Sequence, residues 1–194
     1  MTAFRDLTLY VIRHGECEHN AAGWVAGLDD SPLTARGREQ ARANGRALAE
    51  IAGDLSALDF HASSLHRTCC TMELLREAAG LPATGYRGDG RLVEGNLGDH
   101  ARLGTAEYWD HPDYRADPWN YVRPNGESYA MIHARVARFL ASLARDSVIV
   151  THMLPVMMIR AEYLRLSPEQ AMGYHMGNAG VLRLSMGTDA LFGS

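Results

Sequence analysis

Short apolar runs rich in β-branched residues alternate with segments of helical periodicity, and this alternation constrains the fold of the chain most strongly. Residues 7–12, 58–62 and 147–151 each predict a buried strand, and residues 180–184 predict a last one. Strands that alternate with helices are typical of α/β proteins. The sequence therefore predicts a single domain over residues 1–194, a three-layer α/β/α sandwich whose central sheet is largely parallel or mixed.

N-cap residues and apolar spacing predict the helices between these strands. Thr34 is a good N-cap for one helix, and Ser63 or Ser64 for a second. An amphipathic helix is expected to start near Glu127, and a further helix to cover residues 154–164. Each predicted helix lies between two predicted strands, as the α/β interpretation requires.

Periodicity fades between residues 95 and 123, where aromatic, proline and acidic residues accumulate. We interpret this stretch as a partly helical insertion, which either packs locally or forms a lid over a binding site. We favour the lid. The aromatic residues of the stretch are Tyr108, Trp109, Tyr114, Trp119 and Tyr121.

The composition is that of a folded globular protein without a nucleic-acid-binding face. Hydrophobic residues make up 46%, and 19 basic against 23 acidic side chains give a net charge of -4. Only three cysteines occur, which makes no disulfide framework and favours a reducing compartment. The sequence shows neither a secretory signal nor an apolar run of about 20 residues. It therefore predicts a cytoplasmic protein that binds neither nucleic acid nor membranes, and it does not indicate an oligomeric state.

Polar side chains follow three of the predicted strands where each strand ends. Arg13 and His14 come directly after the first strand, Arg67 follows the second within a few residues, and His152 ends the 147–151 strand. In open α/β sheets, reactive groups collect outside the carboxyl ends of the strands. Two histidines and two arginines are therefore expected to converge at one edge of the sheet.

These residue types suit the chemistry of a phosphate monoester. The guanidinium groups of Arg13 and Arg67 can bind phosphoryl oxygens in bidentate fashion. A neutral imidazole at His14 can attack phosphorus, and His152 can donate a hydrogen bond to the transferring group. Glu94 is the candidate proton donor, with the nearby Asp99 as the alternative.

A metal site is the competing interpretation of the segment that contains His66, Cys69 and Cys70. These residues have ligand-type side chains, but no second ligand pair stands at a matching distance in the sequence. We therefore predict a partly buried helix here, and no metal ligands in the chain.

Several segments resemble the motifs of the histidine phosphatase superfamily, also called the phosphoglycerate mutase-like family. They follow the order of that family over nearly the whole chain. They are Arg13-His14-Gly15-Glu16 with Asn20, residues 27–34 with Gly37, Gln40 and Ala41, residues 63–68, 92–98 and 125–128, and Val148 to His152.

This resemblance implies a phosphoglycerate mutase-like fold and a role for each matched residue. His14 would be the phosphate acceptor and Glu94 the acid and base. Arg13, Asn20, Arg67 and His152 would form the phosphate pocket, together with the backbone N–H of Met153. The resemblance implies no metal and no cofactor.

Two positions depart from the family pattern. Met153 stands where a glycine usually follows the second histidine, so that a side chain crowds this corner of the pocket. Cys17 replaces a threonine or serine and offers only a weak S–H donor. Neither change removes a residue of the catalytic set.

Three functions remain open at this point. The first is a phosphatase that acts on a small phosphorylated metabolite, and the second is a phosphoglycerate mutase that would use 2,3-bisphosphoglycerate. A mutase needs a dry, strongly cationic cavity, whereas residues 95–123 carry three arginines against five acids, and only nine residues follow Ser185. The third is a non-catalytic binder of a phosphorylated ligand. We expect the phosphatase.

Overall fold

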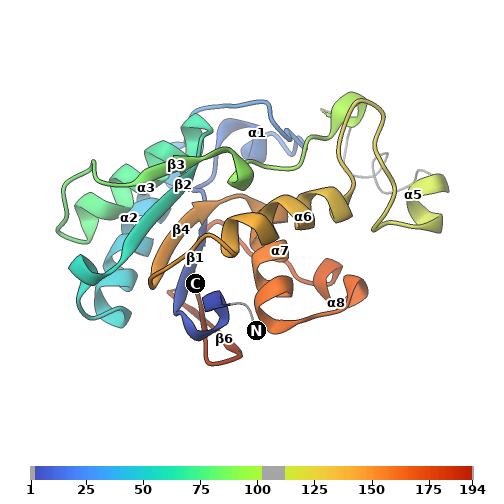
Figure 1. The fold of residues 1–194 in the computed structure, drawn as a ribbon. Helices are drawn as coiled ribbons and strands as arrows, with labels where there is room; N and C mark the ends of the chain where they lie inside the picture. The colour runs from blue at the N-terminus through green and yellow to red at the C-terminus, as the bar shows by residue number, and fades with distance from the viewer. Residues whose placement is uncertain (1–2, 102–111, 194) are drawn as a thin grey trace.

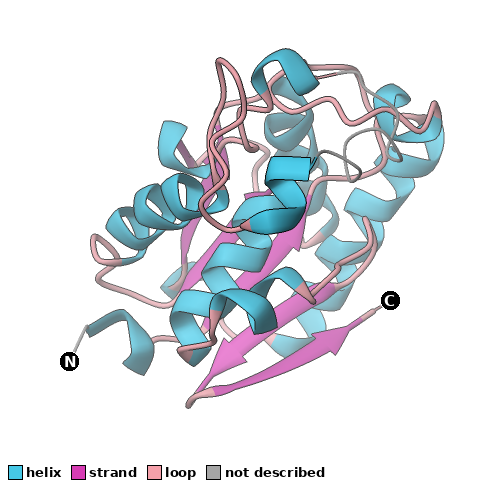
Figure 2. Ribbon diagram, turned by 90° about the vertical axis from the view of Figure 1, so that its right-hand side faces the viewer, coloured by secondary structure: helices cyan, strands magenta, loops and turns pink. Residues whose placement is uncertain are grey.

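Six strands form one mixed sheet at the centre of the protein (Figure 2). The computed structural model describes residues 3–101 and 112–193. The strands are β1 (Leu9–Arg13), β2 (Asp59–Ser63), β3 (Arg87–Asp89), β4 (Ser147–Thr151), β5 (Val181–Ser185) and β6 (Thr188–Phe192). Their order across the sheet is β3-β2-β4-β1-β5-β6. The first four run parallel, while β5 lies antiparallel to β1 and β6 antiparallel to β5.

The four predicted strands are confirmed, but the sequence analysis missed the two edge strands. β3 has only three residues, and none of them is buried. β6 is mostly exposed and continues a tight hairpin from β5. Neither strand carries a continuous apolar run, so neither has the signal that marks a buried strand.

Helices cover both faces of the sheet (Figure 1). The α-helices are α1 (Glu18–Ala21), α2 (Ala35–Ile51), α3 (His66–Ala78), α5 (Pro112–Ala116), α6 (Tyr129–Leu140), α7 (Met153–Leu164) and α8 (Pro168–Met172). The short 3-10 helices are η1 (Ala3–Asp6), η2 (Leu55–Ala57), η3 (Gly90–Leu92) and η4 (Gly98–His100). α2 and α3 pack on one face, and α6 and α7 on the other. The three-layer prediction is therefore confirmed.

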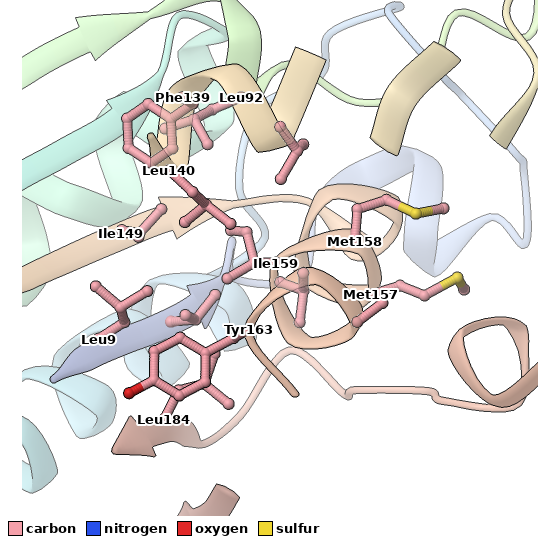
Figure 3. Packing of buried hydrophobic residues seen from close by; sticks show 14 of the residues in the cluster. Leu9, Leu92, Phe139, Leu140, Ile149, Met157, Met158, Ile159, Tyr163 and Leu184 are labelled. Carbon is pink, nitrogen blue, oxygen red and sulfur yellow. The ribbon is translucent and has the colours of Figure 1, made fainter. Parts of the chain in front are cut away.

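The alternation of side chains along the strands divides the core into two clusters. Leu9 and Val11 of β1 point into the cluster with α6 and α7, part of which is drawn in Figure 3. Tyr10 and Ile12 point into the cluster with α2 and α3. Burial on both faces favours a continuous apolar run in a central strand, as residues 148–150 of β4 show.

The N-cap prediction holds for α2 but is wrong for α3. Thr34 Oγ1 accepts the N–H of Gly37, as expected. At α3, Leu65 takes the N-cap position in place of Ser63 or Ser64, and its side chain makes no cap hydrogen bond. The N–H groups of the first turn donate instead to the carboxylate of Asp30, 36 residues earlier in the chain.

The described part of the 95–123 insertion packs against α6. The Trp119 ring lies 5.6 Å from the His133 ring of α6, and Trp119 O accepts the N–H of Ala130. Tyr114 is buried beside Tyr129, with ring centroids 6.2 Å apart. Tyr108 and Trp109 lie outside the described residues. The lid therefore stays a prediction.

None of the helices within residues 3–101 and 112–193 combines the length and apolarity that a membrane span requires.

The contact between α2 and α3 depends on Gly45. A β-carbon at this position would lie 2.2 Å from Leu75 O of α3, which is well inside van der Waals contact. Alanine normally stabilises a helix by about 1 kcal/mol relative to glycine. We expect Gly45→Ala to do the opposite and to lower the free energy of unfolding by about 1–3 kcal/mol, because the two helices must separate. Urea denaturation measures this effect.

Gly88→Ala is the control, because a β-carbon at Gly88 meets no atom within 4 Å. Its free energy of unfolding is expected to stay within about 0.5 kcal/mol of the wild-type value. A Gly45→Ala variant as stable as the wild type would contradict this account of the helix contact.

Candidate active site

The two predicted catalytic histidines follow neighbouring strands. Arg13 of β1 is paired with Thr151 of β4, and the N–H of His14 donates to Thr151 O at 2.9 Å. His14 and His152 therefore leave the sheet side by side, with ring centroids 5.1 Å apart and an interplanar angle of 61°. Both are buried, with 3% and 0% of their surface exposed. The predicted convergence at the strand ends is thus present for the two histidines.

Hydrogen bonds fix both the backbone and the ring of His14. Its Nδ1 lies 2.8 Å from the carbonyl oxygen of Gly15. A carbonyl oxygen only accepts, so Nδ1 carries the proton and Nε2 of the neutral ring keeps its lone pair. His14 O in turn accepts a hydrogen bond from Asn178 Nδ2 at 2.7 Å. The sequence analysis did not identify Asn178.

The turn after His14 requires glycine because α2 passes very close to it. A β-carbon on Gly15 would lie 2.2 Å from Gly37 O, and one on Gly37 would lie 1.9 Å from Glu16 O. Gly15 N also donates to Thr71 Oγ1 of α3 at 3.1 Å. The turn that carries His14 is therefore held between α2 and α3.

Burial keeps both histidines uncharged. Desolvation, reinforced by the positive charges of Arg67 and Arg13, lowers the pKa of His14 to about 3. Desolvation also lowers the pKa of His152 well below its usual value, with His14 and the arginines adding to the effect. At neutral pH, His14 is thus in the form that can act as a nucleophile.

Arg67 binds the loop that precedes α2. Its guanidinium donates to Asp29 O and Gly27 O, both at 2.8 Å, and to Asp30 Oδ1 at 3.1 Å. Asp30 therefore both pairs with this arginine and accepts the amides of the α3 first turn. Because Arg67 is 2% exposed, this pairing also offsets part of the cost of burying its charge.

Arg13 is less completely occupied by the protein. Its Nη1 donates to Met176 O at 3.0 Å, while its buried Nε has no hydrogen-bond partner among the described residues. Burial lowers the pKa of Arg13, and Glu94 opposes that shift by its negative charge. Arg13 directly precedes His14, and its positive charge helps to lower the pKa of both histidines, so it belongs to the same cluster.

Glu94 caps α7. Its two carboxylate oxygens accept the N–H groups of Met153 and Leu154, each at 3.2 Å, and that of Gly95 at 2.9 Å. Two of these amides belong to the first turn of α7, where the helix dipole favours an anion. Asp99, the alternative acid, bonds Nδ2 of the exposed Asn125.

A largely buried ion pair between Arg135 and Glu127 holds the segment that carries Glu94. Arg135 of α6 donates to the Arg91 and Glu94 carbonyl oxygens at 2.7 and 3.0 Å. Glu127 binds the same guanidinium at 3.0 and 3.1 Å, and it also accepts the N–H of Asn96. The sequence analysis did not identify Arg135, because a single arginine on an apolar helix face carries no pattern of its own.

The two remaining predicted pocket residues, Asn20 and Met153, make hydrogen bonds to neighbouring groups of the protein. Asn20 Oδ1 accepts the N–H and the S–H of Cys17, so that the weak S–H donor orients the Asn20 amide. The Met153 N–H, assigned to phosphate from the sequence, donates to Glu94. The Met153 side chain turns toward residue 176, where its sulfur accepts the N–H of Met176 at 3.4 Å.

A serine that the sequence analysis considered only as a helix cap bonds the second histidine. Ser63 Oγ, at the end of β2, lies 2.8 Å from His152 Nε2. The other ring nitrogen of His152, Nδ1, is buried and has no partner among the described residues.

The possible metal ligands on α3 do not form a larger cluster. Cys70 Sγ lies 3.3 Å from His66 Nε2, one helical turn away. Over residues 3–101 and 112–193, no group of three or more His, Cys, Asp or Glu side chains has a geometry that could hold a metal ion.

The lowered pKa of His14 predicts a loss of stability in acid. Between about pH 6.5 and pH 3 the unfolded chain binds a proton at His14 that the folded chain does not, so the free energy of unfolding falls as the pH falls. One such histidine contributes up to about 1.4 kcal/mol per pH unit. His14→Asn should reduce the slope by up to this amount in urea denaturation between about pH 5.5 and pH 4. His175→Asn, at an exposed position, is the matched control, and an unchanged slope in His14→Asn would contradict the assignment.

Comparison with known proteins places this site in a family. The probable phosphoglycerate mutase GpmB of Salmonella arizonae is 39% identical over 141 residues, which cover 70% of this chain and 62% of the relative. A second GpmB, of Salmonella choleraesuis, is 40% identical over 92 residues, 47% of this chain and 40% of the relative. The chain thus spans less than two thirds of the length of these curated relatives.

Solved structures align over almost the whole chain. The alpha-ribazole phosphatase of Shigella flexneri has a TM-score of 0.75 at 25% identity, over 96% of this chain and 95% of that one. A mycobacterial glucosyl-3-phosphoglycerate phosphatase in complex with VO3 has a TM-score of 0.72 at 30% identity, over 96% and 97%. The family model of the histidine phosphatase superfamily (branch 1) matches residues 9–191. The chain therefore belongs to the histidine phosphatase superfamily.

Proposed function

We propose that this protein is a metal-independent phosphomonoester hydrolase that forms a phosphohistidine intermediate on His14. The observation that carries the proposal is the state of His14. Its Nδ1–H is bonded to Gly15 O, its pKa is lowered to about 3, and its Nε2 therefore holds a lone pair at neutral pH. The two nearby arginines supply the positive charge that a metal ion supplies in other phosphatases.

The reaction would proceed in two displacements. In the first, the Nε2 lone pair of His14 attacks phosphorus, the bond to the leaving oxygen breaks, and Glu94 in its acid form donates a proton to that oxygen. In the second, Glu94 takes a proton from water, the resulting oxygen attacks phosphorus, and the P–N bond breaks to release phosphate and restore His14. Arg13, Asn20, Arg67 and His152 would bind the phosphoryl oxygens, whereas the Met153 N–H is held by the Glu94 carboxylate.

The burial of the reacting groups favours a small phosphorylated metabolite as substrate. His14 and His152 are 3% and 0% exposed, so the phosphate must reach below the surface of the protein. A phosphate on a small, flexible molecule can enter such a site more easily than one on a folded protein surface. The named phosphatases among the structural relatives support this substrate class.

A phosphoglycerate mutase is the second candidate, because the curated relatives bear that name. A mutase must return the phosphoryl group to a second hydroxyl before water attacks, which requires a dry and strongly cationic cavity. Arg123, a cation of the 95–123 insertion, is 1% exposed, lies over the Tyr129 ring and donates to Glu127 O. It is thus engaged in structural contacts, and this favours the phosphatase. The third candidate, a non-catalytic binder, would need neither His14 nor Glu94.

Replacement of His14 tests the nucleophile. We expect the wild type to release phosphate from p-nitrophenyl phosphate in the presence of EDTA and to be inhibited by vanadate. His14→Ala should lower kcat by at least about 10³-fold, since it removes the imidazole whose Nε2 attacks phosphorus. His175→Ala, at an exposed position, should keep the wild-type rate. Rapid quenching with labelled substrate should trap an acid-labile phosphohistidine.

The same preparations distinguish the three candidates. A mutase would convert 3-phosphoglycerate to 2-phosphoglycerate when primed with 2,3-bisphosphoglycerate. A binder would bind phosphate or vanadate without any turnover. Full activity in His14→Ala, or a label on another side chain, would refute the proposed mechanism.

The role of Glu94 is tested by the dependence of the rate on the leaving group. Glu94→Gln should lower kcat for an alkyl phosphate by about 10²–10⁴-fold, because the alkoxide needs a proton, and should affect p-nitrophenyl phosphate much less. Glutamine also places an amide N–H₂, which cannot accept a hydrogen bond, near the α7 N–H groups, and this change affects both substrates alike. The readout is therefore the ratio of the losses in kcat on the two substrates. Asp99→Asn is the matched control. Equal losses on both substrates would remove Glu94 from the acid role, and a selective loss in Asp99→Asn would assign that role to Asp99.

A further inference from the structure

The hydrogen bond between Ser63 and His152 lies wholly inside the protein. Ser63 is the last residue of β2 and His152 follows β4, the strand beside it. Both residues are 0% exposed, and Ser63 Oγ lies 2.8 Å from His152 Nε2. Nothing in the two proposed displacements assigns a task to this hydroxyl.

The partners of the hydroxyl decide the direction of this hydrogen bond. Ser63 Oγ has two partners among the described residues, His152 Nε2 and the backbone N–H of Leu65 at 3.4 Å. The N–H of Leu65 can only donate. A buried hydroxyl proton needs an acceptor, and His152 Nε2 is the one that these contacts provide. Ser63 therefore donates and Nε2 accepts.

The direction of the bond fixes the tautomer of His152. When Nε2 accepts a hydrogen bond, the proton of the neutral imidazole lies on Nδ1. A second proton is opposed by burial and by the surrounding cations Arg13, Arg67 and Arg135. His152 is thus a neutral ring with its single N–H at Nδ1.

This N–H is a buried donor that lacks an acceptor in the protein. Nδ1 of His152 has no partner among the described residues, and a buried donor without an acceptor is costly. The ring stands 5.1 Å from that of His14, whose free nitrogen is a lone-pair acceptor. The two neighbouring imidazoles therefore have opposite functions, one as a donor of a hydrogen bond and one as a nucleophile.

We propose that Ser63 is a positioning residue that holds His152 as the Nδ1–H tautomer, so that its Nδ1–H donates to an oxygen of the transferring phosphoryl group. The functional half of this statement rests on the proposed phosphatase mechanism. In the other tautomer, Nδ1 would present a lone pair to an oxygen that is itself negatively charged, and the interaction would be repulsive. The Ser63 hydroxyl excludes that state without touching the substrate.

The tautomer is measured directly by two-bond ¹H–¹⁵N correlation spectra of the full chain labelled with ¹⁵N-histidine. His152→Asn identifies the signals of His152 by their loss. We expect a pyrrole-like Nδ1 and a pyridine-like Nε2 in the wild type at neutral pH. A wild-type His152 with its proton on Nε2 overturns the proposal, and this measurement needs no variant of Ser63.

The functional half is tested by Ser63→Ala against Ser147→Ala. Ser147 is the matched control, because it is also a 0% exposed serine with one donated hydrogen bond, to Arg145 O, at the far end of β4. Ser63→Ala should shift His152 toward the Nε2–H tautomer, lower kcat by roughly 10- to 100-fold and weaken vanadate binding by a similar factor. Ser147→Ala should keep the wild-type His152 spectrum and kcat.

The outcomes separate this inference from the proposed function. If Ser63→Ala keeps both the Nδ1–H tautomer and the wild-type kcat, the hydroxyl does not control His152. If the tautomer is as expected in the wild type but His14→Ala keeps full activity, the phosphatase mechanism fails while the Ser63–His152 bond stands. If both serine variants lose activity equally, the loss reflects stability and the positioning role is refuted.

Discussion

The parallel pairing of β1 with β4 is the constraint on which the site depends. Because Arg13 is in register with Thr151, the two strands end at the same level, and the hydrogen bond from His14 N to Thr151 O extends their ladder by one step. The next residue on each strand is a histidine. A shift in register by a single residue would send one imidazole to the opposite face of the sheet. The backbone register of β1 and β4 therefore brings the two rings together.

Two buried arginines, Arg67 and Arg135, hold the loops around the site in place. Arg67 ties residues 27–30 to the start of α3 through two carbonyl oxygens and the Asp30 carboxylate. Arg135 and Glu127 do the same for the segment around Glu94. Loop backbone has few internal hydrogen bonds, so a multidentate guanidinium can satisfy several carbonyl oxygens at once. Each arginine thus gives its loop the hydrogen bonds to carbonyl oxygens that a helix or a sheet would otherwise provide.

The sequence was sufficient to predict the strand ends but not the contacts between distant loops. The apolar run at 147–151 and the polar residues after each strand predicted the meeting of Arg13, His14 and His152, because strand ends in a parallel sheet share one edge. The Asp30 cap and the Ser63 bond join segments that no local pattern connects. β6 was not predicted, because an exposed edge strand does not need an apolar run.

Burial keeps His14 uncharged, as the proposed nucleophile requires, and also limits the stability of the fold. Removal of water keeps the imidazole of His14 unprotonated. The positive charges of Arg67 and Arg13 add to this effect, and they would lower the pKa of His14 less in bulk water. The same desolvation leaves donors such as Arg13 Nε and His152 Nδ1 without protein partners. An anion that accepts hydrogen bonds from these donors would offset the free-energy cost of burying them without partners. In the proposed mechanism, the donors that folding leaves without partners are the ones that would bind the phosphoryl group, so that binding and catalysis would use the same atoms.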